Sequence, residues 1–310
     1  MKYYLFHANS GMGAGAVKPA PFEYMKASSV HECLEVLESR GPDVKLLAGG
    51  QSLVPLMNLR LTRPEVVVDV NGLADLSYER RDDGVLELGA LRRHTELAES
   101  PGVAEFCPLV ADAASRIGYP AIRNRGTLGG SLVHADPAAE LPCASVALGA
   151  ELVVRGPAGE RRVPAEDFFV SHFTTTLAPT EMVMAVRVPA QRPRQGSAFE
   201  ELARKTGDFA LVAVAALVSL SGKTVGSATV SVAGVGGRPL RMPAAEALVA
   251  GEAPSESLFA AAGKAVTDEV GSSRPPGEDG FRAEVAGVLV ARALVSAWTR
   301  AASEEVQNAC

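Results

Sequence analysis

The chain has 310 residues, of which 47% are hydrophobic and 21% are charged. This is enough apolar material for the cores of two domains of ordinary size. The formal net charge of −6 provides no long basic surface for a phosphate backbone, so nucleic acid is not an expected partner. The longest apolar run, residues 209–220, is well short of the roughly 20 residues that a membrane-spanning helix needs.

The N-terminus and the cysteines bear on the compartment. Residues 1–17 lack the continuous apolar stretch of an export signal, and we interpret them as a flexible extension in which residues 3–6 are a candidate strand. No spacing that suits zinc or an iron–sulfur cluster links the four cysteines, Cys33, Cys107, Cys143 and Cys310. We therefore expect free, buried thiols in a soluble protein of the reducing cytoplasm.

The first predicted element is a helix. Ser29 opens it with a capping-box pattern, and Gly41 with the following proline stops it. The apolar segment Val44–Leu47 predicts a strand. A glycine turn over residues 48–52 then leads into a short helix over residues 53–61.

Strands and a helical stretch follow. Residues 65–70 and Val85–Gly89 have the composition of strands. Residues 103–117 place apolar side chains on one helical face, so Pro108 must lie in a first turn or kink the element. Residues 124–130 are predicted to form a turn-rich loop.

The next segment indicates a hairpin and a domain boundary. Residues 151–155 and 160–163 flank a Gly-Pro-Ala-Gly turn, and residues 182–188 predict a further strand. Residues 189–196 contain several prolines and arginines, and they are the best candidate linker in the chain.

Beyond this linker the pattern again mixes strands and helices. Residues 210–220 and 228–235 are rich in valine and alanine and are predicted to pair as strands, with a buried helix as the alternative for the first. Two helices, over residues 256–270 and 281–302, are separated by a flexible stretch at 271–280. The alternation predicts an α+β fold in both domains.

Two glycine motifs, at residues 48–52 and 127–131, carry the chemistry. Each places paired glycines beside hydroxyl-bearing residues. Glycine lets a backbone approach a diphosphate closely, and successive N–H groups form an anion-binding nest. Neither motif is a Rossmann or Walker A loop, and a Gly-Gly pair is often only a tight turn. The residues alone therefore leave two alternatives, a phosphate-containing ligand or two tight turns.

At these motifs the chain resembles a known family, the FAD-binding medium subunits of molybdenum hydroxylases of the carbon monoxide dehydrogenase and xanthine dehydrogenase type. The likeness runs from about residue 21 to residue 301. It is carried by the segments 47–58, 122–132, 134–142 and 204–208.

The resemblance implies an FAD-binding domain of the vanillyl-alcohol-oxidase (PCMH) type over residues 18–192 and a smaller α+β C-terminal flavoprotein domain over residues 197–305. In such a fold the two glycine loops hold the FAD diphosphate and the adjoining ribityl group, and Glu140 is an acidic contact to FAD. The residues that the resemblance implies for cofactor binding are Leu46, Leu47, Ala48, Gly49, Gly50, Gln51, Ser52, Leu53, Gly118, Thr127, Leu128, Gly129, Gly130, Ser131, Glu140, Val183 and Lys205.

The sequence departs from the family pattern at one place. Relatives often carry a lysine where this chain has Glu200 and Glu201. This raises the question whether Glu201 replaces a flavin-contacting lysine, with Lys205 as the residue that compensates.

Several candidate residues also have simpler interpretations. Asp136 is equally suited to starting a turn before a proline. Taken without the family pattern, Glu140 is an exposed carboxylate at a helix start. Arg123 is interpreted as a solvated loop charge, and His94 and His134 as loop or core residues rather than metal ligands.

The resemblance implies a division of labour between subunits. A large partner carries the molybdopterin cofactor that hydroxylates the substrate, a small partner carries two [2Fe-2S] clusters, and this FAD passes the electrons to an external acceptor. A flavin supplies its own redox chemistry, which agrees with the lack of an acid–base motif here. The implied assembly is a dimer of heterotrimers.

Two other functions remain as alternatives. One is a self-contained flavin oxidase or reductase, and the other is a non-enzymatic scaffold, against which the intact glycine motifs argue. Carbon monoxide, purines, N-heterocycles and aldehydes all stay open as the substrate of the complex, because its pocket would lie on the large partner.

Overall fold

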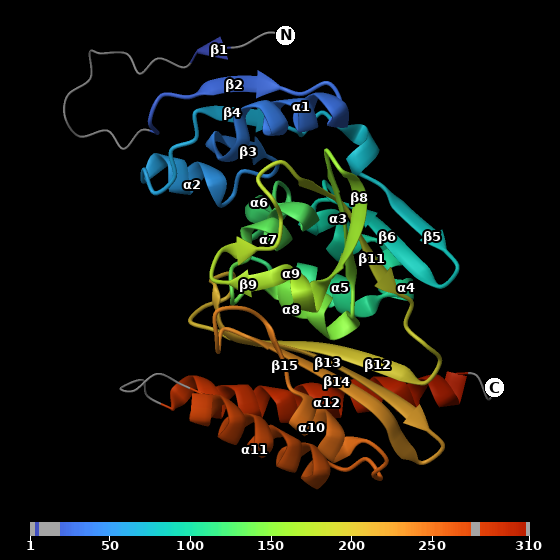
Figure 1. Ribbon diagram of the computed structural model, residues 1–310. Coiled ribbons are helices and arrows are strands. Elements are labelled where there is room, and N and C mark those ends of the chain that lie inside the picture. The colour runs from blue at the N-terminus through green and yellow to red at the C-terminus, as the bar shows by residue number, and fades with distance from the viewer. Residues whose placement is uncertain (1–3, 6–18, 274–279, 308–310) are drawn as a thin grey trace.

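The structure is a computed structural model that describes residues 4–5, 19–273 and 280–307, and the side chains of 19–273 and 280–303 within them. Its elements form three tiers along the chain (Figure 1). The N-terminal tier holds the first sheet, the central tier holds a second sheet with most of the short helices, and the C-terminal tier holds a third sheet with three helices on one side. Each tier contains a hydrophobic core.

The N-terminal tier is built on a sheet with strand order β1-β2-β4-β3, in which β2, β4 and β3 are parallel and β1 is antiparallel. Helix α1 contributes Cys33, Val36 and Leu37 to its core. The elements of this tier are β1 (Tyr4–Leu5), β2 (Glu23–Lys26), α1 (Val30–Arg40), the 3₁₀ helix η1 (Gly41–Asp43), β3 (Val44–Leu47), α2 (Leu53–Asn58), β4 (Val66–Asp69) and the 3₁₀ helix η2 (Ala74–Leu76).

The central tier contains an antiparallel sheet with strand order β5-β6-β11-β7-β8. Its strands are β5 (Glu79–Asp82), β6 (Val85–Gly89), β7 (Glu151–Gly156), β8 (Gly159–Pro164) and β11 (Met182–Pro189), and β9 (Phe169–Ser171) and β10 (Thr174–Thr175) form a separate small hairpin. Its helices are α3 (His94–Glu99), α4 (Pro101–Phe106), α5 (Pro108–Arg116), α6 (Pro120–Arg123), α7 (Leu128–His134), α8 (Glu140–Leu148) and α9 (Ala165–Phe168).

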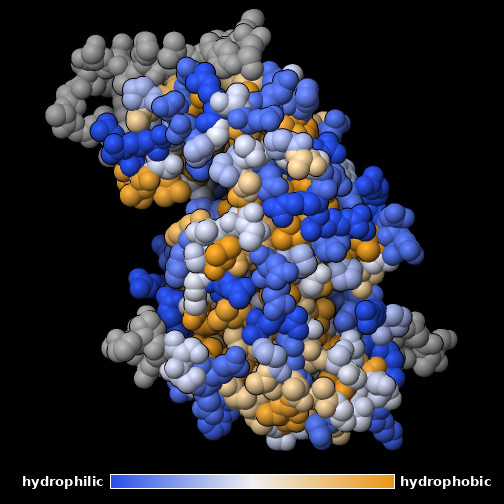
Figure 2. Space-filling model, viewed as in Figure 1, coloured by the Kyte–Doolittle hydropathy of each residue, from blue (hydrophilic) through white to orange (hydrophobic). Residues whose placement is uncertain are grey.

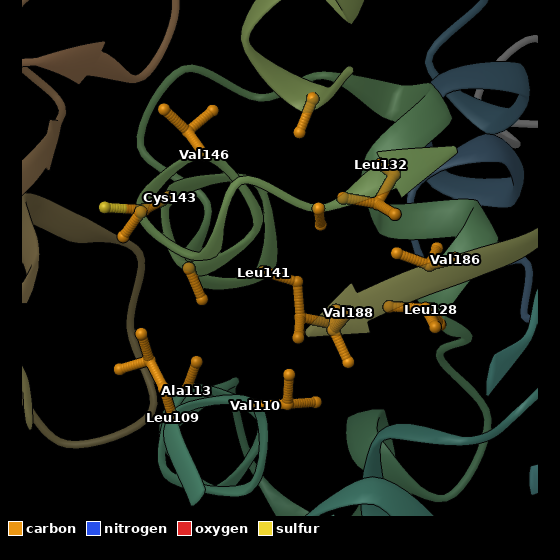
Figure 3. Packing of buried hydrophobic residues seen from close by; sticks show 14 of the residues in the cluster. Leu109, Val110, Ala113, Leu128, Leu132, Leu141, Cys143, Val146, Val186 and Val188 are labelled. Carbon is orange, nitrogen blue, oxygen red and sulfur yellow. The ribbon is translucent and has the colours of Figure 1, made fainter. Parts of the chain in front are cut away.

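Helix α8 joins the central and C-terminal tiers. Residues 140–147 are all buried, as expected for a helix covered on every side. Figure 3 shows Leu141 of α8 in the same core as Leu128 of α7 and Val188 of β11. On the opposite side, Cys143 Sγ lies 3.4 Å from the carbonyl oxygen of Ser231 in the C-terminal sheet.

The C-terminal tier is an antiparallel sheet with strand order β12-β13-β14-β15. Alternate residues of its strands point to opposite faces. Phe199, Ala213 and Ala215 belong to the core of the central tier, whereas Val212 and Val214 belong to the core that the helices cover. The elements are β12 (Gln195–Ala203), β13 (Ala210–Ser221), β14 (Thr224–Ala233), β15 (Leu240–Arg241), α10 (Pro243–Val249), α11 (Glu256–Ser273) and α12 (Phe281–Gln307).

Most elements agree with the sequence predictions, and the α+β fold class is confirmed. The two valine- and alanine-rich segments pair antiparallel with Val214 opposite Val232, so the helix alternative for the first is wrong. Pro108 begins α5 and separates it from α4, as predicted. The hairpin with Gly156 opposite Gly159 is also confirmed.

Three predictions need correction. The loop predicted at residues 124–130 is in part a helix, because Thr127 caps α7 and the glycine pair lies inside its first turn. The linker at residues 189–196 is shorter than predicted, since β12 already begins at Gln195. The flexible stretch at 271–280 is helical as far as Ser273, and residues 274–279 lie outside the described part.

The predicted helix over residues 281–302 is confirmed as α12. Residues 281–303 of α12 are long and apolar enough to cross a membrane by length and composition. Their apolar side includes Ala286, Val290 and Leu294, which are buried in the C-terminal core against the sheet. Helices that are buried in a protein core are commonly this apolar, so burial accounts for the composition of α12.

Candidate functional site

The first glycine loop connects β3 to α2 and exposes a row of backbone donors. Across the part of the chain that the structure describes, no acceptor is recorded for the backbone N–H groups of Gly49, Gly50, Gln51, Ser52 or Leu53. Such successive N–H groups attract an anion. Gly50 has φ +73°, a conformation that L side chains rarely adopt and that glycine adopts at no cost.

The second glycine loop lies directly against the first. A Cβ atom on Gly49 would collide with the backbone of Arg125 and Gly126. Only a glycine therefore lets these two segments, which are far apart in the sequence, approach so closely. The tertiary structure thus brings the two glycine motifs together.

The two motifs differ in what their backbones offer. In the second motif the N–H groups of residues 128–131 already have acceptors within the chain: Leu128 N donates to Arg92 O at 3.0 Å and Gly129 N to Ala90 O at 2.8 Å. Gly130 N donates to Thr127 Oγ1 at 3.1 Å, as in an N-cap. A Cβ on Gly129 would meet Ala90, so this glycine serves close packing. Among the described residues, the first loop therefore has five open N–H groups, whereas the second motif has only that of Thr127.

Asn71 and Arg93 hold the two loops together, and the sequence analysis did not single them out. Asn71 Nδ2 donates to Ala48 O at 2.8 Å, and Arg93 Nη2 donates to Asn71 Oδ1 at 2.7 Å. Arg93 also donates to the carbonyl oxygen of Arg125. The sequence did contain a signal for Asn71. Asp69 and Asn71 are polar residues at the end of the apolar strand β4, which is parallel to β3, and parallel strands of one sheet end at the same edge.

His94 supports the second loop from behind. It is 5% exposed, and its Nε2 lies 2.9 Å from the carbonyl oxygen of Thr127, so Nε2 carries the hydrogen. Burial lowers the pKa of His94 to about 4, which keeps the ring neutral. The interpretation of His94 as a core residue is confirmed.

Gly118 and the 204–208 segment meet at the boundary between tiers. Gly118 has φ +47°, and Arg123 Nη1 donates to its carbonyl oxygen at 2.9 Å, so Arg123 closes a turn. Gly207 packs against the ring of Tyr119, which is 50% exposed. Lys205 lies exposed on the same hairpin loop, between β12 and β13.

Two carboxyl groups lie near this boundary, that of Glu140 buried and that of Glu201 half-buried. Glu140 begins α8 and is 8% exposed, so its interpretation as an exposed helix-start carboxylate is wrong. Burial raises the pKa of Glu140 to about 7, and the charges of Glu201 and Asp136 act in the same direction. Burial also raises the pKa of Glu201, against the opposing charge of Arg116. Asp136 accepts from Ala138 N at 2.9 Å and so starts the predicted turn.

The remaining candidates differ in exposure. Leu46, Leu47, Ala48 and Leu53 are half-buried around the first loop, as is Ser131 in the second. Leu128 is 2% exposed and Val183 is 5% exposed, and both belong to the core of the central tier. The structure therefore places these two in the core as packing residues.

An apolar patch adjoins the first loop. Val54, Leu59 and Leu61 are 42%, 63% and 71% exposed. Figure 2 shows hydrophobic residues over α2 at the lower edge of the N-terminal tier, above a hollow between this tier and the central one. A ligand with both an anionic and an apolar part suits a site that combines open N–H donors with such a surface.

The thiols are structural in the described part of the chain. Cys33, Cys107 and Cys143 are free and buried, as predicted, while Cys310 lies outside it. Burial raises the pKa of Cys107 and of Cys143 to about 12. Within residues 19–273 and 280–303, no group of three or more potential ligands could hold a metal ion.

The fold and the two glycine loops are those of a class of proteins that bind a diphosphate-containing cofactor. Residues 20–191 match the family described as the FAD binding domain in molybdopterin dehydrogenase, and residues 197–297 match the CO dehydrogenase flavoprotein C-terminal domain. The chain belongs to this family of FAD-binding subunits, and its cofactor is FAD.

Individual relatives are similar over almost their whole length. The 6-hydroxypseudooxynicotine dehydrogenase complex subunit alpha of Paenarthrobacter nicotinovorans is 39% identical over 92% of this chain and 97% of the relative. The carbon monoxide dehydrogenase medium chain of Hydrogenophaga pseudoflava is 38% identical over 92% and 99%.

Solved structures have the same fold. A chain of carbon monoxide dehydrogenase from H. pseudoflava matches with a TM-score of 0.86 at 39% identity, over 91% of this chain and 99% of that one. A chain of quinoline 2-oxidoreductase from Pseudomonas putida 86 matches with a TM-score of 0.85 at 33% identity, over 92% and 99%. The protein is thus an oxidoreductase subunit, the FAD-binding electron-transfer subunit of a multi-subunit molybdenum hydroxylase.

Proposed function

We propose that the first glycine loop holds the FAD diphosphate through the backbone N–H groups of residues 49–53. The observation that carries this proposal is their lack of acceptors among the described residues, at a point where the second loop closes against Gly49. The second loop then acts through its shape and the hydroxyl of Ser131, since the N–H groups of residues 128–131 are already engaged.

The other candidate residues have supporting parts in this assignment. Leu46, Leu47 and Leu53 shape the first loop, and Leu128 and Val183 form the apolar floor beneath the cofactor. The further residues that we assign to the cofactor site are Ala48, Gln51, Ser52, Gly118, Thr127, Gly129, Gly130, Glu140 and Lys205. Bound FAD supplies the redox chemistry, and these residues bind it and orient it.

We also propose the assembly in which the subunit works. The FAD-binding domain spans residues 18–192 and the C-terminal domain residues 197–305. A large molybdopterin subunit and a small subunit with two [2Fe-2S] clusters complete a heterotrimer, which forms a dimer in the cytoplasm. Electrons leave this chain for an external acceptor. Relatives that are complex subunits or medium chains support this assignment.

Metal and flavin contents test the assembly. The chain should be purified alone, reconstituted with FAD, and compared with the complex from its native host. We expect the lone chain to bind FAD without oxidising a substrate, and the native preparation to bring iron, molybdenum and two further chains. A lone chain that turns over a substrate would instead establish the alternative of a self-contained oxidase.

A further inference from the structure

One guanidinium group bridges the two glycine loops. Arg93, directly before α3, donates from Nη1 to the carbonyl oxygen of Arg125 at the start of the second loop. Its Nη2 donates to Asn71 Oδ1 at 2.7 Å. Asn71 Nδ2 in turn donates to Leu47 O at 3.2 Å and to Ala48 O at 2.8 Å, where the first loop begins. The half-buried charge of Arg93 is therefore held at the junction of the loops.

The guanidinium group lies close to the open N–H groups of the first loop. The oxygen that it contacts, Arg125 O, is the atom nearest to a Cβ placed on Gly49, at 2.3 Å. Gly49 is the first of the five residues whose backbone N–H groups have no recorded acceptor in the described part of the chain. A single carbonyl group thus separates the charge of Arg93 from the place where we assign the diphosphate.

This charge has no carboxylate partner. Among the side chains that the structure describes, no carboxylate forms an ion pair with the guanidinium of Arg93. Asp69 accepts from Tyr24 and Asn71. Glu96 accepts from the backbone N–H of Arg93 and not from its guanidinium. A half-buried guanidinium without a carboxylate partner keeps its charge available for an anionic ligand.

Two neighbouring arginines differ from Arg93 in their contacts. Arg92 Nη2 lies 3.1 Å from Glu79 Oε2 of β5, so this guanidinium is in an ion pair. Arg123 Nη1 donates to the carbonyl oxygen of Gly118 at 2.9 Å, in the turn that it closes. Of these three arginines, Arg93 is the one whose guanidinium bridges the glycine loops.

Such a cation affects the binding of an anionic cofactor in two ways. The diphosphate of FAD is negatively charged, and a positive charge behind a single carbonyl group attracts it by an amount that dissolved salt screens. The hydrogen bonds of the guanidinium also fix the loops relative to each other, and this direct contact is less sensitive to salt. The dependence of binding on salt therefore reports the charge separately from the bridge.

We propose that Arg93 is a positioning residue for the FAD diphosphate, which it attracts by its charge while its hydrogen bonds hold the two glycine loops in place. The inference rests on the proposed cofactor site, and it adds a cation that the glycine motifs do not contain. The open N–H groups of residues 49–53 contact the diphosphate, and Arg93 supplies a full positive charge behind them.

Titrations of the full-length apo-protein with FAD at several salt concentrations test this proposal. Arg93→Gln removes the charge. It should weaken FAD binding roughly tenfold at low ionic strength but only about two- to threefold in about 0.5 M salt, where the charge is screened. Arg93→Lys keeps the charge and loses the planar fork, so it should restore the salt dependence of the wild type even where its affinity is lower. Flavin fluorescence measures the dissociation constants.

ADP as a competitor of FAD locates the effect within the cofactor. ADP carries the diphosphate without the flavin, so Arg93→Gln should weaken the binding of ADP and of FAD by the same factor. Equal affinity of the variant and the wild type for ADP would show that Arg93 does not act on the diphosphate, and would overturn the inference.

Arg92→Gln is the matched control, because it removes the same charge from the neighbouring residue, whose guanidinium contacts Glu79 and neither glycine loop. The ratio of its FAD affinity to that of the wild type should stay nearly constant with salt, whatever loss of fold stability urea denaturation shows. A ratio for Arg93→Gln that is equally constant, or an Arg93→Lys variant with the salt dependence of Arg93→Gln, would overturn this inference alone. Absence of FAD binding by the wild-type chain would overturn the proposed cofactor site as well.

Discussion

Gly49 is the residue at which the two glycine loops touch backbone to backbone. An alanine there would force its Cβ into the carbonyl group of Arg125, and neither backbone can move without disturbing both loops. We expect Gly49→Ala to weaken FAD binding at least tenfold and to destabilise the fold by about 1–3 kcal/mol, the usual cost of overpacking. Flavin absorbance after reconstitution and urea denaturation measure the two effects.

Gly271 provides the control for this substitution. It lies in α11, and the nearest atom to an added Cβ is the Cβ of Ala283 at 4.0 Å. Gly271→Ala should bind FAD normally and gain up to about 1 kcal/mol, because alanine favours a helix. Normal FAD binding by Gly49→Ala would contradict the role of the first loop.

Glu140 gives a prediction about stability and pH. Its pKa is about 7 in the folded protein and close to its ordinary value of 4.5 when the chain unfolds. A raised pKa means that the folded state loses stability as the pH rises from about 4.5 to 7. Each pKa unit corresponds to about 1.4 kcal/mol, so the loss at pH 8 is on the order of 3 kcal/mol.

Glu140→Gln should therefore be more stable than the wild-type apo-protein at pH 8 and about equally stable at pH 5. Urea denaturation at the two values compares them. An equal difference at both would show that the charge of Glu140 has no part in the effect.

At the scale of the element, helix α7 depends on its cap. Thr127 is 2% exposed, and its hydroxyl oxygen accepts from Gly130 N, in a helix of seven residues that contains two glycines. We expect Thr127→Ala to cost about 1 kcal/mol, and Thr127→Ser to retain most of the stability because serine caps equally well. If serine is as damaging as alanine, the methyl group of Thr127 and not the cap is what matters.

At the scale of the whole molecule, the buried thiols report on how the tiers separate. Cys33 lies in the N-terminal core, Cys107 in the central core, and Cys143 between the central tier and the C-terminal sheet. Buried thiols with a raised pKa react slowly. A thiol reagent at pH 8 should therefore leave all three unmodified in the native protein.

Intermediate urea concentrations extend this test. Cys143 should react first if the C-terminal tier detaches as a unit, and peptide mapping identifies the labelled residue. Simultaneous reaction of the three would instead indicate that the tiers unfold together. A Cys143→Ser variant identifies its signal.

The candidate site was predictable only in part. The glycine motifs stand out in the sequence because paired glycines beside hydroxyl groups form a local pattern. The resemblance then connected these motifs with a family of FAD-binding subunits. Asn71, Arg93 and the buried state of Glu140 were not visible. Their roles depend on contacts with residues more than 20 positions away, such as Asn71 with Ala48 and Arg93 with Asn71.

The sequence by itself determined the elements whose signals are local. Hydrophobic periodicity, a proline at a helix start and a glycine turn act within a few residues, and they predicted α1, α5, the β7–β8 hairpin and the pairing of β13 with β14. Only the tertiary structure decided which loop keeps most of its N–H groups open and that the carboxyl group of Glu140 is buried. Hydrogen-bond partners and burial depend on the packing of distant segments, and no local pattern records them.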